Sequence, residues 1–422
     1  MLIEFRVQNF RALRDEQVLS LVAGASDGQM AATHLHETGL AAKGLTHAVR
    51  SAVIYGANAS GKSTVLLALN YMRMVVAESA TVIQPGQIYN VQPFRLDSQK
   101  ERQPISFELT FMMNGIRHEY AFAMRPERIL RETLRVYSSA KPTPWFVREF
   151  DDETQTDRYE FSAALKGKKA LWQESTRPNA LFLSTAAQLN SEMLMPVFRW
   201  ITQQITMIPA GLMMDPSHTL TLLATPDGKA QVQTFLSRAD FAISEVKTIT
   251  RKGARQQVLV AASGQVQTNR IEGEIVQPQF VHNTQAGSAT FELHEESDGT
   301  QHLFGLIGPL MQVLQNGQVL LVDELDSSLH ALLVRQLVDL FHSPANAHGA
   351  QLIFTTHDTA LLDNNIFRRD QIWFTEKDAA QAARLYPLSD FSPRNTEAFE
   401  RNYLKGRYGG IPFLGGSLVE RL

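Results

Sequence analysis

Apolar residues recur with two different periods along this chain, and the alternation between them predicts the core of the fold. Residues 52–55 form a short apolar run typical of a buried strand, and apolar residues recur at helical spacing after the glycine-rich stretch that follows. The same patterns predict buried strands at 319–322, 351–356 and 371–375 and a helix at 329–340. We therefore expect βαβ units that build one sheet.

A second pattern predicts antiparallel pairing. Two β-rich runs, 105–113 and 116–124, flank Asn114-Gly115, which is the strongest short-range signal of a hairpin. Residues 133–138 have the composition of a third strand. An antiparallel sheet should therefore join the βαβ core.

The remaining pattern is less regular. Residues 1–10 read as a strand, and the polar, glycine-bearing stretch 24–47 reads as an irregular loop. Between about 140 and 285 we expect an insertion with charged turns, a mostly helical stretch at 180–207 and β-like segments at 245–262. Helical spacing mixed with breaks predicts two short helices within 180–207.

These elements predict an α/β fold: a core with a mixed sheet, an antiparallel β subdomain and an inserted α-rich (α+β) subdomain. An amphipathic helix at 301–314, in which Pro309 predicts a kink or an early break, opens the last part. We expect domain boundaries that give residues 1–139 to the first half of the core with its β subdomain, 140–289 to an inserted lid-like or arm-like subdomain, and 290–422 to the second half of the core.

Composition narrows the class of protein. A length of 422 residues with 44% hydrophobic and 20% charged residues is typical of a soluble globular protein, and no signal-like start or run of 18 apolar residues is present. We therefore expect a cytoplasmic protein without membrane contact. The complete lack of cysteine excludes disulfides, cysteine nucleophiles and cysteine metal sites. The net charge of -3 neither indicates nor excludes nucleic-acid binding.

The stretch from Gly56 to Ser63 matches a phosphate-binding loop and stands between a predicted strand and a predicted helix, as such a loop requires. Its glycines allow a tight turn with inward-pointing N–H groups, Lys62 would reach the β- and γ-phosphates, and Ser63 would hold Mg²⁺. We expect a nucleoside triphosphate and Mg²⁺ as ligands. The residues predicted to bind the nucleotide are Gly56, Asn58, Ser60, Gly61, Lys62, Ser63 and Thr64.

Polar residues follow two of the predicted buried strands. Asp323 and Glu324 end the run 319–322, at the strand end where open α/β sheets bind ligands. Asp323 would hold the metal through water, and Glu324 would polarise the water that attacks the γ-phosphate. His357 ends a neighbouring strand and would donate to the γ-phosphate or the attacking water, unless it only caps that strand.

A fourth feature is the polar turn from Glu296 to Gln301, which leads into the amphipathic helix. The hydroxyl of Ser297, the amide of Gly299 and the helix dipole together form an anion site, so this turn would grip a phosphate. The alternative is a simple helix cap by Ser297 or Asp298.

Taken in this order, the four features resemble the ATP-binding-cassette (ABC) ATPases, specifically the soluble branch that contains SMC, RecF and OLD-type proteins. The resemblance implies an ABC-type P-loop NTPase core in which Lys62 and Ser63 belong to Walker A, Asp323 and Glu324 to Walker B, residues 327–330 to the D-loop, and His357 is the switch histidine. The Ser297 turn would replace the signature, with one glycine where the family has two. Gln92 is the candidate Q-loop residue and metal ligand, although a plain turn glutamine fits equally well. The family implies an ATP-bound dimer, or a higher oligomer, in which this turn caps the partner's nucleotide.

A closer resemblance is to the bacterial AAA15-type group of OLD/ABC-like ATPases linked to abortive infection and phage defence, including RloA-like proteins. It rests on the opening run 5–11, the run 323–330 and the tail 408–412. It implies an ATP-hydrolysing switch that controls a separately encoded, nuclease-like effector.

Two other functions stay open. A RecF-like or SMC-like clamp would bind DNA, or RNA, directly through basic segments such as 166–169 and 251–255, although solvated loops explain both segments. A small-molecule kinase would need a pocket for the phosphate acceptor, and it would not require a histidine at position 357.

Overall fold

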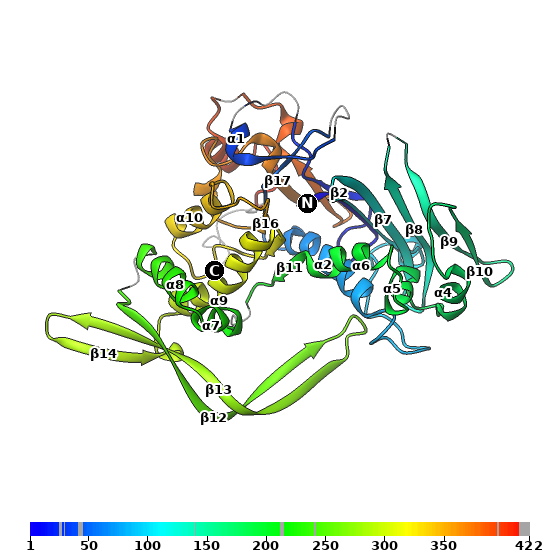
Figure 1. Cartoon of the computed structure of the whole chain (residues 1–422). Helices are drawn as coiled ribbons and strands as arrows, with labels where there is room; N and C mark the ends of the chain where they lie inside the picture. Colours follow the sequence, from blue (N-terminus) through cyan, green and yellow to red (C-terminus); the bar gives the residue numbers. More distant parts are fainter. Residues whose placement is uncertain are drawn as a thin grey trace, which may run out of the picture.

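The fold is built on two large β-sheets that share one buried layer of helices (Figure 1). The computed structural model describes residues 1–24, 28, 30–40, 45–139, 141–211, 215–239, 242–394 and 396–412. The first sheet is six-stranded and mixed, in the order β11-β15-β16-β5-β17-β18, with all neighbours parallel except the β17–β18 pair. Its strands are β5 (Ser51–Gly56), β11 (Ile205–Ile208), β15 (Val319–Val322), β16 (Gln351–Thr355), β17 (Ile372–Lys377) and β18 (Ala383–Pro387).

The mixed sheet is buried on both faces, which explains the continuous apolar runs of its central strands. Along β5, Ala52 and Ile54 point into a core that contains the helix α2 (Lys62–Glu78) and the antiparallel sheet. Val53 and Tyr55 point into a second core with α9 (Asp298–Asn316) and α10 (Ala331–Phe341). The βαβ expectation is therefore confirmed, with one helix layer on each face.

The second sheet has seven antiparallel strands in the order β10-β9-β8-β7-β6-β1-β2. The predicted hairpin is confirmed, and its turn residues Asn114 and Gly115 both have positive φ, 53° and 73°, as a two-residue turn of this kind requires. The strands are β1 (Leu2–Gln8), β2 (Gln17–Ser20), β6 (Ile105–Met113), β7 (Ile116–Arg125), β8 (Arg128–Tyr137), β9 (Thr143–Asp151) and β10 (Thr156–Phe161).

Within the expected insertion, several strands instead belong to the two large sheets. β9 pairs with β8 and β10 pairs with β9, so the antiparallel sheet continues past the expected boundary at 139. β11 pairs with β15 inside the mixed sheet. β10 and β11 are only six and four residues long, so a period within them is hard to separate from chance. The two expected short helices are present as α5 (Phe182–Gln188) and α6 (Met195–Gln203).

The β-like segments expected at 245–262 are confirmed, and they belong to a long two-stranded ribbon. β12 (Glu245–Val260) and β13 (Val266–Thr284) pair along their full lengths, and β14 (Gly287–Glu292) pairs with the end of β13. Figure 1 shows the ribbon as a bent strap along the lower edge of the molecule. Its tip returns to the body, where Ala262 donates to Glu78 Oε2 (2.6 Å) and accepts from the hydroxyl of Tyr71 and the amide of Asn90.

Other elements depart from the expectations in smaller ways. The stretch expected as an irregular loop contains β3 (Leu35–Glu37) and β4 (His47–Val49), which form a two-stranded sheet. Pro309 does not end α9, because the helix continues to Asn316 and buries one face along its whole length. No helix within the described ranges combines the length and apolar content needed to cross a bilayer. The remaining helices are α1 (Ala31–His34), α3 (Ser98–Glu101), α4 (Lys169–Ser175), α7 (Ser217–Leu223), α8 (Pro226–Arg238) and α11 (Phe399–Leu404), with 3-10 turns at Leu293–Glu295, Thr359–Leu361, Arg369–Gln371 and Leu388–Phe391.

Candidate functional site

The glycine-rich loop joins the C-terminal end of β5 to the N-terminus of α2. A β-carbon at Gly56 would lie 2.4 Å from Thr375 Oγ1 and 2.5 Å from Ser60 Oγ, so only glycine allows this approach of the loop to β17. Gly61 has φ of 111° and would place a β-carbon 2.6 Å from Ala383. The two glycines are therefore required by the shape of the loop itself.

Lys62 is buried, and its ammonium group donates to the carbonyl oxygens of Gly56 (2.8 Å) and Ala57 (3.1 Å). Burial lowers the pKa of Lys62, an effect that Glu324, Asp323 and Asp326 oppose. A buried ammonium held by two neutral carbonyls, inside a loop that begins a helix, favours an anion at this position.

The other loop residues divide into buried and accessible positions. Ser60 is buried and shares a 2.6 Å hydrogen bond with Thr375, so its hydroxyl fastens the loop to β17. Asn58 is exposed, and Thr64 is half-buried in the first turn of α2. Asn58 and Thr64 are therefore accessible to a ligand, whereas Ser60 is not.

Ser63 and Asp323 lie side by side although 260 positions separate them in the chain. The Ser63 hydroxyl donates to Asp323 Oδ1 at 2.9 Å, and the hydroxyl of Thr355 donates to the same oxygen at 2.7 Å. Asp323 is buried at the end of β15. The fold therefore brings together the hydroxyl and the carboxylate expected to hold Mg²⁺.

Glu324 follows Asp323 in a left-handed conformation, with φ of 56°. Its backbone amide donates to Thr355 Oγ1 at 2.7 Å, and its side chain is half-buried. A non-glycine residue with positive φ is strained and persists only where the surroundings hold it. Thr355 was not singled out from the sequence, because a threonine at the end of an apolar strand carries no motif.

His357 lies two residues beyond β16 and is exposed. Its amide donates to Asp326 Oδ2 at 3.2 Å, and no hydrogen bond connects its imidazole to a described residue. The other oxygen of Asp326, Oδ1, is buried and has no partner in the described part of the chain. The backbone of His357 is thus positioned, while its ring is open to solvent or to a ligand.

The turn before α9 has the geometry of a helix cap. The Ser297 hydroxyl accepts from the amide of Thr300 at 3.2 Å and shares a 2.8 Å hydrogen bond with the Thr300 hydroxyl. A β-carbon at Gly299 would lie 2.8 Å from the carbonyl oxygen of Ser328. Gly299 therefore has a packing role within this chain, next to the run 327–330.

Gln92 is contacted by Arg11 rather than by Ser63 or Asp323, the residues expected to hold the metal. Its side chain is exposed, and its carbonyl oxygen accepts from the amide of Arg11 at 2.8 Å. No hydrogen bond joins the Gln92 side chain to Ser63 or Asp323 in the described chain. Its assignment as a metal ligand remains a prediction.

The C-terminal tail packs against the start of the phosphate loop. A β-carbon at Gly410 would lie 3.7 Å from the α-carbon of Gly56, and the Gly410 carbonyl accepts from the hydroxyl of Tyr403 at 3.0 Å. Tyr403 in turn stacks on Phe374 of β17, with ring centroids 5.3 Å apart. The glycine-rich tail at 408–412, noted in the sequence, thus belongs to the surroundings of the loop.

The residues at this site fit a Mg²⁺–nucleotide complex. Mg²⁺ in such sites takes one or two protein oxygens and completes its shell with phosphate oxygens and water. Ser63 and Asp323 supply two oxygens, and Lys62 supplies the positive charge. Within the described residues, no group of three or more histidines and acidic residues forms a metal site independent of a nucleotide.

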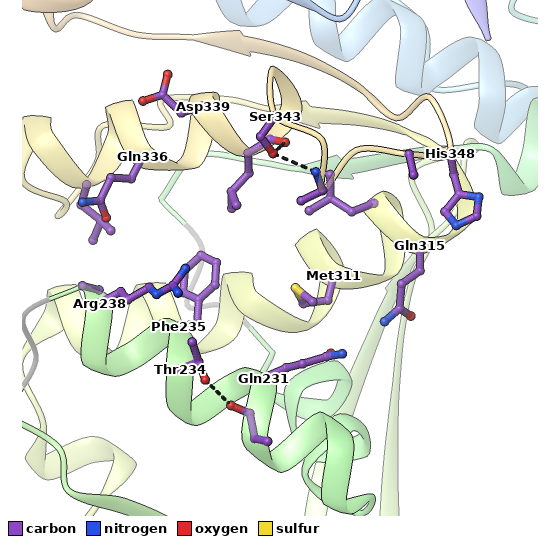
Figure 2. A pocket seen from close by; sticks show the side chains of 17 residues that line it. Gln231, Thr234, Phe235, Arg238, Met311, Gln315, Gln336, Asp339, Ser343 and His348 are labelled. Carbon is purple, nitrogen blue, oxygen red and sulfur yellow. Dashed lines mark hydrogen bonds between the residues drawn. The ribbon is translucent and has the colours of Figure 1, made fainter. Parts of the chain in front are cut away.

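A large cavity lies elsewhere in the described structure. It has a volume of about 850 Å³ and opens between α8, α9 and α10, with Phe235 and Met311 on its apolar surface and Arg238 facing it from α8 (Figure 2). None of the predicted site residues lines it. The candidate nucleotide site instead combines Lys62 and the loop that follows β5 with the acidic residues that follow β15.

Comparison with known proteins finds one matching family model. The model described as "AAA domain, putative AbiEii toxin, Type IV TA system" matches residues 51–363. No curated protein matches the sequence.

Solved structures similar to this chain include three SMC head domains. The SMC head domain from Thermotoga maritima is 13% identical, with coverage of 92% of this chain and 98% of that chain and a TM-score of 0.40. An SMC head bound to the C-terminal winged-helix domain of ScpA is 10% identical, with coverage of 92% and 97% and a TM-score of 0.43. An SMC head with an extended coiled coil, bound to the C-terminal domain of ScpA derived from Pyrococcus furiosus, is 9% identical, with coverage of 93% and 97% and a TM-score of 0.40. Likenesses at this level say nothing about function.

Proposed function

The chain belongs to the AAA-domain family described by reference to an AbiEii toxin and a type IV toxin–antitoxin system, and from this membership we propose that it is an ATP-hydrolysing switch. Membership makes it an ATPase of the AAA/ABC type. The proposal adds that ATP closes a dimer, that hydrolysis opens it, and that this cycle controls a separate effector in defence against phage.

One observation carries the proposal: Ser63 Oγ lies 2.9 Å from Asp323 Oδ1, next to the buried ammonium of Lys62. Mg²⁺ bound there would neutralise phosphate charge. The protein's own contribution is to hold Lys62 for the phosphates, Ser63 and Asp323 for the metal, and Glu324 to orient and polarise a water molecule. We expect His357 to contact the terminal phosphate.

The surface on which a second copy of the chain would dock in the proposed dimer is exposed. Ser297, Ser328 and Leu332 are exposed around the contact between Gly299 and the run 327–330. In the proposed dimer, this surface meets the nucleotide of the other copy, so that ATP contributes to the interface and stabilises the associated state.

The proposed effector is a separate, nuclease-like protein. The family description, with its toxin and toxin–antitoxin system, supports a role in defence. Direct DNA binding is less well supported, because Arg251 in the basic segment 251–255 pairs with Glu292 at 2.8 Å.

Two variants test the proposed hydrolysis. Lys62→Ala should lose ATP binding, measured by calorimetry, because the ammonium that faces the phosphates is removed. Glu324→Gln should bind ATP with parent affinity, hydrolyse it at least about 10²-fold more slowly and accumulate as a dimer in size-exclusion chromatography. Turnover of Glu324→Gln at the parent rate would contradict the assigned role of Glu324.

The role in defence needs a separate measurement. Phage should form fewer plaques on cells that carry the parent gene with its native neighbours than on cells without it. Plaque numbers should return to the higher level when the gene encodes Lys62→Ala. Equal plaque numbers for parent and variant across a panel of phages would remove the defence part of the proposal and leave the ATPase part intact.

A further inference from the structure

Thr355 occupies a position between the two halves of the candidate site. It is the last residue of β16, the strand that lies between β5, which leads into the phosphate loop, and β15, which ends at Asp323. Its side chain is fully buried. The strand order therefore places one hydroxyl where the phosphate loop and the acidic strand end come closest.

Thr355 makes hydrogen bonds to three consecutive residues. Its hydroxyl donates to Asp323 Oδ1 at 2.7 Å and accepts from the amide of Glu324 at 2.7 Å. Its carbonyl oxygen accepts from the amide of Leu325 at 3.1 Å. The turn that carries both acidic side chains is thus fastened to β16 by one residue.

The hydroxyl of Thr355 holds both the carboxylate of Asp323 and the backbone of Glu324. Asp323 Oδ1 receives hydrogen bonds from both Ser63 and Thr355, and these two donors restrict the orientation of the carboxylate. Glu324 has φ of 56°, and its amide has Thr355 Oγ1 as its acceptor. Without that acceptor, nothing else in the described contacts holds the amide of Glu324, and its strained conformation would relax.

We propose that Thr355 is a positioning residue for hydrolysis, which orients the carboxylate of Asp323 and holds the backbone of Glu324 in the strained conformation that aims its side chain. This inference rests on the proposed function. Valine has the same shape as threonine but can neither donate nor accept, whereas serine keeps the hydroxyl. The pair of substitutions therefore separates hydrogen bonding from packing.

The first experiment is a kinetic comparison. Thr355→Val should lower kcat for ATP by about 10²-fold, because a small misplacement of a catalytic group has this effect, while the affinity for ATP without Mg²⁺ changes less than about 3-fold. Thr355→Ser should restore kcat to within about 3-fold of the parent. The Mg²⁺ concentration needed for half-maximal ATP binding should rise in Thr355→Val and stay at the parent value in Thr355→Ser.

A matched control addresses general destabilisation. Thr219 is also fully buried, donates to the carbonyl of Phe304 (2.6 Å) and accepts from the amide of Gly308 (2.9 Å), but it lies in α7 away from the site. Thr219→Val should lower the thermal midpoint about as much as Thr355→Val and leave kcat within about 2-fold of the parent.

A second readout needs no nucleotide. Hydrogen exchange at the amides of Glu324 and Leu325 should be at least about 10-fold faster in Thr355→Val than in the parent, and unchanged in Thr355→Ser. If the parent hydrolyses no ATP, the proposed function fails while the exchange measurement still decides whether Thr355 holds this turn. Parent kcat in Thr355→Val, or equal loss of kcat in the serine and valine variants, would overturn the proposal.

Discussion

Gly299 lies directly against the backbone of Ser328, so closely that a β-carbon at Gly299 would stand 2.8 Å from the Ser328 carbonyl oxygen. This contact joins the turn that begins α9 to the run that follows the acidic strand end. The two segments therefore pack against each other within a single chain.

Gly299→Ala should disturb this contact. The added methyl group forces the two segments apart, and we expect a loss of about 1–3 kcal/mol in the free energy of unfolding, as for overpacking elsewhere. Urea denaturation measures it. The control is Gly273→Ala, since a β-carbon at Gly273 meets no atom within 4 Å. Equal stability of the parent and Gly299→Ala would show that the segments separate without cost.

The stability of the fold should depend strongly on Glu132. It is fully buried, accepts from the amides of Phe182 (2.6 Å) and Leu183 (2.9 Å) at the start of α5, and lies beside the buried guanidinium of Arg148. Glu132→Ala leaves these donors without an acceptor and should cost about 3–5 kcal/mol, measured by chemical denaturation.

The surface pair of Arg131 and Glu149 is the control for that prediction. Both side chains are 55% exposed and lie 3.1 Å apart, so Glu149→Ala should cost less than about 1 kcal/mol. A similar loss in the two variants would contradict the importance of burial.

Stability should fall in mild acid because of a cluster of buried histidines. The rings of His34 and His342 lie with their centroids 3.7 Å apart at an interplanar angle of 31°, and burial lowers the pKa of both, with Arg50 adding to the effect. Burial also lowers the pKa of His36 to about 4. The unfolded chain binds protons as pH falls through about 6.5 while the native histidines stay neutral, so stability present above pH 6.5 is lost between about pH 6.5 and 4, by up to about 1.4 kcal/mol per pH unit for each histidine.

Urea denaturation at pH 8 and pH 5 tests this dependence. His342→Gln should reduce the slope between these pH values, whereas His294→Gln should not, because the His294 side chain is 77% exposed. An unchanged slope in His342→Gln would assign the acid sensitivity to other groups.

The tip of the β12–β13 ribbon should depend on Glu78. Its carboxylate accepts from the amide of Ala262 at 2.6 Å at the far end of the helix that begins with Lys62. Glu78→Ala removes a hydrogen bond to a charged group, worth about 1.5–3 kcal/mol, so amides at 261–264 should exchange at least about 10-fold faster. Glu274→Ala, an exposed position on the same ribbon, should leave their exchange unchanged.

Much of the core could be predicted where the local signal was strong. The hairpin at Asn114-Gly115, the buried strands that end at Val322 and Thr355, and the loop from Gly56 to Ser63 each carry a pattern set by neighbours in sequence. The β-like segments at 245–262 could also be predicted, whereas their pairing with Val266–Thr284 and the short strands β10 and β11 could not. Pairing depends on contacts outside the local pattern, and runs of six and four residues are too short to show a clear period.

The sequence by itself determined which segments form strands and helices in the core and which residues have the chemistry to bind phosphate and metal, since both depend on local spacing and residue type. Only the tertiary structure decided which strand ends become neighbours. Thr355 meets Asp323 across 32 positions, and Ala262 meets Glu78 across 184, because strand order and the return of the ribbon bring them together. Such contacts depend on the packing of the whole chain, and no short stretch of sequence contains them.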